Sequence, residues 1–448
     1  MDRAPYGPLL LVALCLALGL VRWRWRLTGA RRPSARLGRR RAWRPRAPED
    51  CAVCRAEDAG RSNAARAAAP VRPWAAVKSR RGAPKRRSTA GYACPSPACP
   101  YQGITDERVH ALIGYGYHGT TDRIRDLRCQ ACGSKVSARR GTALYQLKTP
   151  PARVGEVLSA LAEGLDVAAA ARVFGHSEAT ISAWLTRAGQ HANRLHARLF
   201  RQLHLPHVQL DEIRTRLRPR GRVLWLWLAM DPLSKIVPVV HLGPRTQQAA
   251  HAVIHALRAA LAPACVPAVT SDGLRLYFYA LTAHFGLWVG LGRRRRWQVT
   301  PALLYGQVQK CYRRRRLVRI RYRVPCGGRT TLRAALQALG LSGRLNTAFV
   351  ERLSLTVRQG VAALTRRTWS TAQSATHLRL HLEWWRGYYH FVRPHQGLRV
   401  ARARPRPRDG RCLPQRYQRR TPAMAAGVTT HCWSPLEFLA HPCAPALT

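Results

Sequence analysis

The sequence predicts an α/β protein, with a mixed sheet and flanking helices, preceded by two small modules. Three observations lead to this prediction. Strand-like and helix-like segments alternate between residues 205 and 400, four cysteines in two close pairs precede them, and an alanine-rich helical stretch lies between. We expect five regions: a basic extension (1–90), a cysteine module (91–145), a helical module (150–200), an α/β domain (205–400) with a basic insertion at about 286–342, and a peripheral tail (401–448).

The charge of the chain points to a polyanionic partner. Lysine and arginine number 76 against 21 acidic residues, a formal net charge of +55. A protein this basic repels itself unless a polyanion neutralises it, so nucleic acid is the expected partner. An arginine-rich codon bias is an alternative source of the excess, without changing its electrostatic consequence. The 13 cysteines show no regular disulfide-like framework, which suggests a reducing cytoplasm and some metal ligands.

The first 90 residues are expected to form a disordered basic arm. Residues 21–90 are rich in arginine, proline and alanine and show no sustained apolar periodicity. The apolar run at 8–21 is short for a membrane span, so we expect no membrane association, with a signal anchor as the alternative. The pair Cys51-x2-Cys54 has no nearby partners and is interpreted as a chance occurrence.

Two cysteine pairs indicate a metal site. Cys94-x4-Cys99 is followed after 29 residues by Cys129-x2-Cys132. Four thiolates in two chelating pairs suit a tetrahedral structural Zn²⁺ ion, so we expect a zinc ribbon over 91–145. Four ordinary buried cysteines are the alternative.

The helical module has the pattern of a helix-turn-helix. Residues 166–188 read DVAAAARVFGHSEATISAWLTRA, in which Gly175 can end a short helix and Ser177 can cap a second one that buries Ile181 and Trp184. In this motif the second helix enters the major groove. The residues expected to be most exposed to DNA are Glu178, Thr180, Ser182 and Arg187, and of these Thr180, Ser182 and Arg187 are expected to bind it. An ordinary helical hairpin is the alternative.

The α/β domain begins with strands and continues in an informative order. Residues 208–213, 223–230 and 236–242 are predicted as three antiparallel strands, followed by a helix at 247–261 and a buried strand at 266–271. This is the order of a ribonuclease H-like core. In that fold the first strand and the later parallel strand are neighbours.

Three scarce carboxylates fall where this core would gather them. Asp211 lies in the first strand, Asp272 directly follows the fourth, and Glu351 begins a helical run at 349–364. Converging carboxylates repel unless cations lie between them, and hard oxygen ligands suit Mg²⁺ or Mn²⁺. Two such ions about 4 Å apart promote displacement at phosphorus. Taken singly, the three also fit a surface charge, a helix cap and a solvated helix residue.

Other acidic residues are expected to have structural roles. Glu212 should point to the opposite face of its strand from Asp211, because strand side chains alternate. Asp231 is expected to serve a turn. Glu383 precedes two tryptophans on a later helix and is expected to be structural, with an auxiliary role as the alternative.

Two basic segments are candidates for DNA contact. Arg313 opens the stretch RRRRLVRIRYR, which alternates like a strand and favours a DNA-tracking ribbon over a solvated surface. In residues 387–398 the aromatic side chains can stack on unpaired bases while cationic neighbours meet phosphate, or the segment can be a packed helix end. The residues concerned are Tyr388, Tyr389, His390, Arg393, His395 and Arg399.

Several motifs resemble those of bacterial insertion-sequence DDE transposases of the insertion sequence 1 family. They are QLDEI around Asp211, TSDGL around Asp272, LNTAFVERLSLTVRQ around Glu351 and YYHFVRPHQGLR near the end, within a resemblance that covers about residues 94–399. The resemblance implies a ribonuclease H-like domain that nicks element ends, after which the freed 3′-hydroxyl attacks target DNA. By motif position it implies the triad Asp211, Asp272 and Glu351. The long basic stretch before Glu351 departs from compact family members.

The expected function is therefore that of a DNA transposase acting on double-stranded DNA. We expect two Mg²⁺ or Mn²⁺ ions, a structural Zn²⁺, a homo-oligomer on DNA and a cytoplasmic, nucleoid-associated location. A catalytically inactive, transposase-derived DNA-binding protein or repressor is the alternative. A related nuclease or resolvase-like enzyme that releases cut DNA is a third hypothesis.

Overall fold

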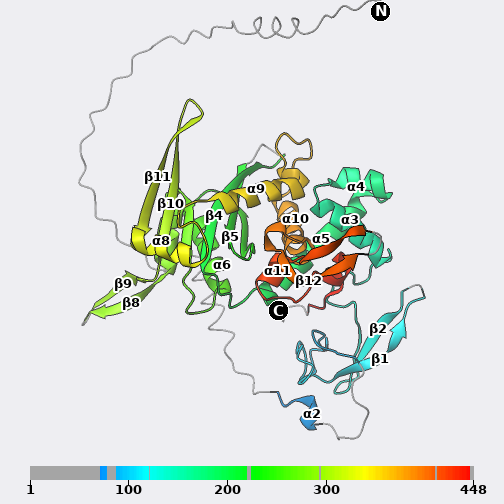
Figure 1. The fold of residues 1–448 in the computed structure, drawn as a ribbon. Coiled ribbons are helices and arrows are strands. Elements are labelled where there is room, and N and C mark those ends of the chain that lie inside the picture. Colours follow the sequence, from blue (N-terminus) through cyan, green and yellow to red (C-terminus); the bar gives the residue numbers. More distant parts are fainter. Residues whose placement is uncertain are drawn as a thin grey trace, which may run out of the picture. The chain divides into compact units, whose positions relative to one another are not determined.

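The computed structural model describes most of the chain (Figure 1). The chain divides into two compact units, Met1–Arg44 and Pro45–Thr448, and every described residue belongs to the second. The apolar run at 8–21 and the Cys51–Cys54 pair lie outside the described residues. The described ranges are 71–77, 87–120, 122–218, 223–291, 294–408 and 411–443.

A six-stranded mixed sheet lies at the centre of the α/β domain, which confirms the expected α/β class. Its strand order is β11-β10-β7-β4-β5-β6. β4 and β7 are parallel, as are β7 and β10, whereas the pairs β4–β5, β5–β6 and β10–β11 are antiparallel. The strands are β4 (His207–Arg216), β5 (Val223–Met230), β6 (Val239–Gly243), β7 (Ala268–Asp272), β10 (Tyr305–Arg313) and β11 (Arg316–Cys326).

Helices cover both faces of this sheet, which explains why β5 is almost wholly apolar. Leu226 and Leu228 pack with residues of α9 (Ala348–Gly360) and α10 (Ala375–Gly387). Trp227, between them in sequence, packs with residues of α6 (Gln247–Ala260) and α7 (Arg275–His284). Successive side chains of a strand point to opposite faces, so a strand covered on both sides needs apolar residues throughout. The short helix η3 (Ala362–Leu364) follows α9.

Two details of the sheet differ from the sequence prediction. The third strand begins at Val239 rather than at residue 236, because Pro238 donates no hydrogen bond and the Val237 N–H instead donates to Nε2 of His390 at 2.9 Å. The expected insertion at 286–342 is wrong in its centre, since β10 lies there and is a core strand. Its residues 305–308 are buried and pair in parallel with β7.

The remainder of that stretch surrounds β10. A two-stranded hairpin of β8 (Gly286–Leu291) and β9 (Arg294–Val299) precedes it, and α8 (Arg329–Ala338) follows β11. Figure 1 shows β10 and β11 extending beyond the rest of the sheet as a ribbon. This extension arises because the later half of β10 and all of β11 are polar or basic on at least one face.

The cysteine module is a three-stranded antiparallel sheet of β1 (Leu112–His118), β2 (Ile124–Cys129) and β3 (Lys135–Ser137). The short helix α2 (Trp74–Val77) belongs to it. Trp74 contacts Tyr101 edge-on, and its indole N–H donates to Oε1 of Gln130 at 2.8 Å. The expected disorder up to residue 90 is therefore wrong for the described residues 71–77 and 87–90. Within 71–77, the contacts of Trp74 fix the chain against the cysteine module.

Three helices follow, and their ends lie close to the predicted ones. They are α3 (Pro151–Ala162), α4 (Val167–Phe174) and α5 (Glu178–Leu199). Gly175 ends α4 with φ of 70°, and the Ser177 side chain accepts from the Thr180 N–H at the start of α5. α5 continues to Leu199 and packs on α10, where Gly189 meets the Leu380 backbone so closely that a Cβ would lie 2.2 Å from its carbonyl oxygen.

The C-terminal segment is not peripheral, contrary to expectation. Phe438 and Leu439 are fully buried in the main core, and Phe438 packs against Trp384 and Phe391. The apolar sequence PLEFLA, begun by a Ser434 cap, supplies this core surface. The C-terminal elements are η4 (Tyr388–Val392, a π-helical turn), η5 (Gln396–Leu398), β12 (Val400–Arg408), β13 (Arg411–Gln418), α11 (Pro422–Ala425) and α12 (Pro435–Ala440).

Across the described part of the chain, no helix has both the length and the apolarity needed to cross a membrane.

Candidate active site

Asp211 and Asp272 occupy neighbouring positions on two adjacent strands. β4 and β7 run parallel with Leu210 opposite Ser271, so Asp211 and Asp272 are the next residues of each strand. β7 ends at Asp272, whose Oδ1 accepts from the Leu274 N–H at 2.9 Å as the chain turns towards α7. The sequence order thus brings together two carboxylates that are separated by 60 residues.

Glu351 approaches from the helix that covers one face of the sheet. It lies in the first turn of α9, and its Oε1 accepts from Lys310 Nζ at 2.5 Å and from Thr347 Oγ1 at 2.6 Å. Ser354, one turn later on the same helix, donates to Oδ2 of Asp211 at 3.0 Å. α9 therefore supplies an acid to the site and holds Asp211 by a hydrogen bond.

Burial and mutual repulsion raise the pKa of Asp211 to about 6. Burial is the larger cause, because a charged carboxylate loses solvation inside the protein. The nearby negative charges of Asp272 and Glu351 act in the same direction, against the hydrogen bond from Ser354. Asp272 and Glu351 are thus close enough to Asp211 for their charges to influence its pKa. Among the described residues, however, the three carboxylates do not form a group whose ligand atoms already lie close enough together to hold a metal ion.

Glu212 contacts the other side of the sheet, as its position next to Asp211 predicts. Its carboxylate is almost fully buried, forms an ion pair with Arg245 and accepts from the Tyr277 hydroxyl at 3.1 Å. Burial, followed by the charge of Asp272, raises its pKa to about 7 despite the arginine. Glu212 is therefore a buried structural acid whose charge reaches the site.

The other two acidic residues set aside in the sequence have structural partners. Asp231 is buried and accepts from the backbone N–H groups of Leu233 and Ser234 at 3.1 and 2.9 Å, which is the expected turn chemistry. Glu383 is buried on α10 in an ion pair with Arg386.

Sequence reasoning missed the polar residues that hold the carboxylates. Ser354 could have been found, since it lies three residues after Glu351 and therefore on the same helical face. Lys310 could not, because its place beside Glu351 depends on β10 being a core strand.

The four cysteines gather as the sequence predicts. Within the ranges that the structure describes, they are the one group of potential ligands whose donor atoms all lie within 4.8 Å of one another. The Sγ atoms of Cys94 and Cys132 are 3.5 Å apart, and those of Cys99 and Cys129 are 3.8 Å apart. Zinc–sulfur bonds of about 2.3 Å at tetrahedral angles place thiolates about 3.8 Å apart. The cluster could therefore bind a metal such as zinc.

The predicted DNA-contact residues of α5 are only half-exposed. The hydroxyls of Thr180 and Ser177 are hydrogen-bonded at 2.9 Å, and Ser182, two residues further along the helix, is half-buried. Arg187 donates from Nη1 to the Tyr145 carbonyl oxygen at 2.5 Å, so its guanidinium is already engaged within the protein. The more exposed residues at the start of the helix are Glu178 and Ala179.

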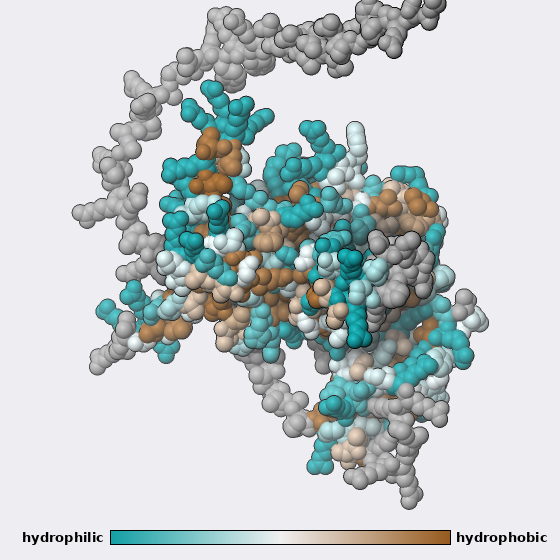
Figure 2. All heavy atoms as spheres, viewed as in Figure 1, coloured by the Kyte–Doolittle hydropathy of each residue, from teal (hydrophilic) through white to brown (hydrophobic). Residues whose placement is uncertain are grey.

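The β10–β11 ribbon carries exposed cations and exposed apolar side chains together. Arg313 is exposed near its turn. Figure 2 shows hydrophilic residues at the tip of the ribbon and a hydrophobic band below it. The exposed apolar members are Tyr312, Leu317, Val318, Ile320 and Tyr322.

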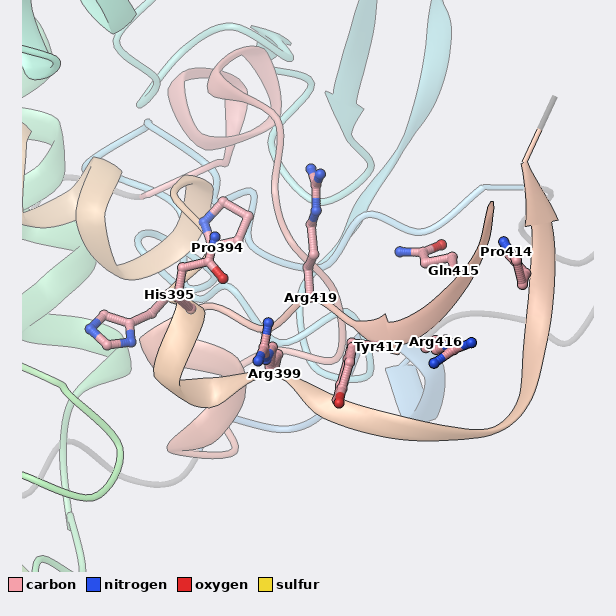
Figure 3. A pocket seen from close by; sticks show the side chains of 9 residues that line it. Pro394, His395, Arg399, Pro414, Gln415, Arg416, Tyr417 and Arg419 are labelled. Atoms are coloured by element: carbon pink, nitrogen blue, oxygen red, sulfur yellow. The ribbon is translucent and has the colours of Figure 1, made fainter. Parts of the chain in front are cut away.

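The structure supports the packed helix end for part of residues 387–398. Tyr389 and His390 are buried, so they form a packed helix end rather than a stacking surface. Arg393 is half-exposed and lies 3.5 Å from a carboxylate oxygen of Glu163. His395 and Arg399 line an open cavity with β13 (Figure 3).

No protein-family model matches the chain, and no curated protein matches its sequence.

Proposed function

We propose that this chain is a DNA transposase that cuts element ends and joins them to target DNA by phosphoryl transfer. The observation that carries the proposal is the register of β4 and β7, which makes Asp211 and Asp272 neighbours. The influence of both Asp272 and Glu351 on the pKa of Asp211 adds the third carboxylate. The motifs that resemble those of the insertion sequence 1 family contain these same three residues.

The strand order supports a ribonuclease H-like core. Three antiparallel strands in the order β6-β5-β4 are continued by two strands, β7 and β10, parallel to β4. β11 is then an additional edge strand. In this interpretation the acids lie where the first and fourth strands of the core adjoin, covered by α9.

Asp211, Asp272 and Glu351 would hold two Mg²⁺ or Mn²⁺ ions, and their oxygen donors suit these metals. When bound, such ions activate the attacking oxygen and stabilise the leaving oxygen at phosphorus. Ser354 orients Asp211, and the Asp272 carboxylate is fixed by the Leu274 N–H. Lys310 neutralises Glu351 in the structure and would meet a DNA phosphate once Glu351 turns towards the metals.

The N-terminal modules and the charge support DNA as the substrate. A zinc ion in the four-cysteine site would fix the β1–β3 sheet, and α4 with α5 would act as a helix-turn-helix. The net charge of +55 suits a long phosphate surface. A homo-oligomer on the nucleoid DNA of the cytoplasm belongs to the same proposal.

One observation favours a second candidate, a catalytically inactive, transposase-derived DNA-binding protein or repressor. The ion pair between Lys310 and Glu351 occupies a carboxylate that the metals need. A protein that only binds DNA could keep this pair permanently.

A strand-joining assay separates the candidates. Purified protein is incubated with Mg²⁺ and linear DNA that carries the sequences flanking its gene, together with a target plasmid. We expect cut 3′-ends joined to the target, loss of both steps in Asp272→Asn with retained DNA binding, and normal products from the charge-matched control Asp122→Asn. Binding without chemistry would indicate the repressor, and cutting without joining would indicate a nuclease.

A further inference from the structure

A cationic cavity lies between the loop that follows η4 and strand β13. It has a volume of about 770 Å³ and is open to solvent. Residues 394–399 form one wall, and Arg416, Tyr417 and Arg419 belong to the other (Figure 3). A cavity of this size holds one or two nucleotide units.

The lining of the cavity is positively charged, with no acidic residue in it. Arg399, Arg416 and Arg419 have no carboxylate partner among the described residues. The Arg399 guanidinium lies over the Tyr417 ring, 4.5 Å from its centroid, and Tyr417 is 44% exposed. Three uncompensated guanidinium groups attract phosphate, and an exposed ring stacked with arginine offers a platform for a base.

The charge of a residue on the helix that carries Glu351 reaches one wall of the cavity. His395 is on that wall, and its ring contacts Tyr389 edge-on, with centroids 6.4 Å apart. Burial lowers the pKa of His395, and the charges of Lys235, Arg393 and Arg352 act in the same direction. Arg352 directly follows Glu351 on α9. Positive charge thus extends from the candidate carboxylates to the cavity.

We propose that this cavity binds an unpaired nucleotide of the DNA strand beside the cut site. The base stacks on Tyr417, and the flanking phosphates contact the three arginines. A base pair inside a duplex keeps both faces stacked on its neighbours, whereas an unpaired base can present a whole face to Tyr417 and place its own phosphates beside the arginines. The proposal rests on the proposed function, since it assigns this nucleotide to the strand held at Asp211, Asp272 and Glu351.

A second cavity provides a matched control. It has a volume of about 450 Å³ and is lined by Arg329, Arg333, Arg344 and Tyr322, so it carries the same number of arginines. It lies against β11 and α8, and among the described residues none of its three arginines stacks on the ring of Tyr322. Removing its three arginines changes the net charge of the protein equally.

The test compares the binding of two fluorescent probes to the full chain, a blunt duplex and the same duplex with a three-nucleotide single-stranded tail. Mg²⁺ and Mn²⁺ are omitted so that binding does not depend on cleavage. For wild type we expect the tail to strengthen binding. Tyr417→Ala should weaken tailed-duplex binding about tenfold, the scale of one base–aromatic stack, and leave the blunt duplex within about twofold.

The triple variant Arg399→Ala, Arg416→Ala, Arg419→Ala should likewise abolish the advantage of the tail, whereas Arg329→Ala, Arg333→Ala, Arg344→Ala should retain it. Equal losses for both triple variants, or equal losses on both probes, would overturn the proposal and assign the effect to bulk charge. Competition by free deoxynucleoside monophosphate as strongly as by the tail would also overturn it, because the ligand would then be a free nucleotide. The variant Asp272→Asn should bind the tailed duplex as the wild type does. A failure of this binding test can then be distinguished from a failure of the proposed catalysis.

Discussion

At the scale of single residues, the adjacent acids Asp211 and Glu212 of β4 have different roles, because their side chains meet different partners on opposite faces of the sheet. Asp211 is half-buried and the Glu212 carboxylate is almost fully buried, and the pKa of each is raised. Glu212 has a permanent cation in Arg245 and a buried hydroxyl donor in Tyr277. Asp211 has the neutral donor Ser354 and the like charges of Asp272 and Glu351. Asp211 therefore has no ion pair of its own, although the charges of Lys310 and Arg358 are felt at it, and a metal ion would supply a closer cation.

This difference predicts that Asp211→Asn stabilises the metal-free protein at neutral pH. The pKa of Asp211 is raised to about 6, so the folded state binds the proton more tightly than the unfolded state does. Stability is then lost as pH rises from about 4 through about 6. The variant, which cannot ionise, should gain up to about 3 kcal/mol at pH 7.5, because one pKa unit corresponds to about 1.4 kcal/mol.

Urea unfolding with and without Mg²⁺ measures this effect. The gain should vanish near pH 4, and Mg²⁺ should stabilise the wild type but not the variant. Asp122→Asn, at a half-exposed ion pair with Arg139, serves as the control and should show neither trend. A gain for Asp211→Asn that is the same at pH 4 and pH 7.5 would contradict the electrostatic account.

At the scale of elements, the cysteine module depends on its ligands more than on its core. Few residues outside the cysteines are buried there, chiefly Tyr101, Ala111, Leu112, Leu127 and Val136. So small an apolar cluster provides limited stability by itself, and metal ligation supplies the rest.

Cys129→Ser should therefore abolish the metal site and unfold the module. We expect about one Zn²⁺ per chain in the wild type and none in the variant, measured by elemental analysis after gel filtration, with weaker binding to element ends. Cys265→Ser, at a half-buried cysteine distant from the cluster in sequence, should keep its zinc. Unchanged zinc content in Cys129→Ser would refute the ligand assignment.

The sequence predicted those elements whose pattern is local. α4, α5, β5 and α6 lie within a few residues of their predicted ends, since caps, alternation and helical periodicity are properties of a short window. β10 was missed as a core strand because its short buried segment 305–308 includes a glycine and a glutamine and is followed by a long basic stretch, and parallel pairing with β7 leaves no local signal. The buried role of Phe438 was missed for the same reason, since its partners lie far away in the sequence.

The candidate site, too, could be predicted where the signal is local and could not where it depends on packing. Asp211, Asp272 and Glu351 could be proposed from strand ends and motif order alone. The partner Lys310 could not, because its place beside Glu351 depends on how α9 and β10 pack together. Thr347, four residues before Glu351 at the start of α9, is a local partner that the sequence could have suggested. Arg187 illustrates the opposite error. Its position on the helix predicted a DNA contact, but its guanidinium donates a hydrogen bond to the Tyr145 carbonyl oxygen instead.

At the scale of the whole molecule, the net charge of +55 governs how the protein meets DNA. Cations occur on the β10–β11 ribbon, around the cavity at Arg399 and beside Glu351. Binding through many phosphate contacts releases counterions, so affinity should fall about 10³-fold or more between about 50 and 200 mM salt. Fluorescence anisotropy on a duplex measures this slope. A flat response would remove DNA phosphate as the source of affinity.

The central claim is that Asp211, Asp272 and Glu351 together hold divalent metal ions. A crystal structure of the protein grown with Mn²⁺, with the metal located by its anomalous scattering, tests this claim most directly. We predict Mn²⁺ bound to carboxylate oxygens of Asp211 and Asp272, with Glu351 turned from Lys310 towards the metal. Crystals in which these carboxylates hold no Mn²⁺ and Glu351 remains paired with Lys310 would contradict the account.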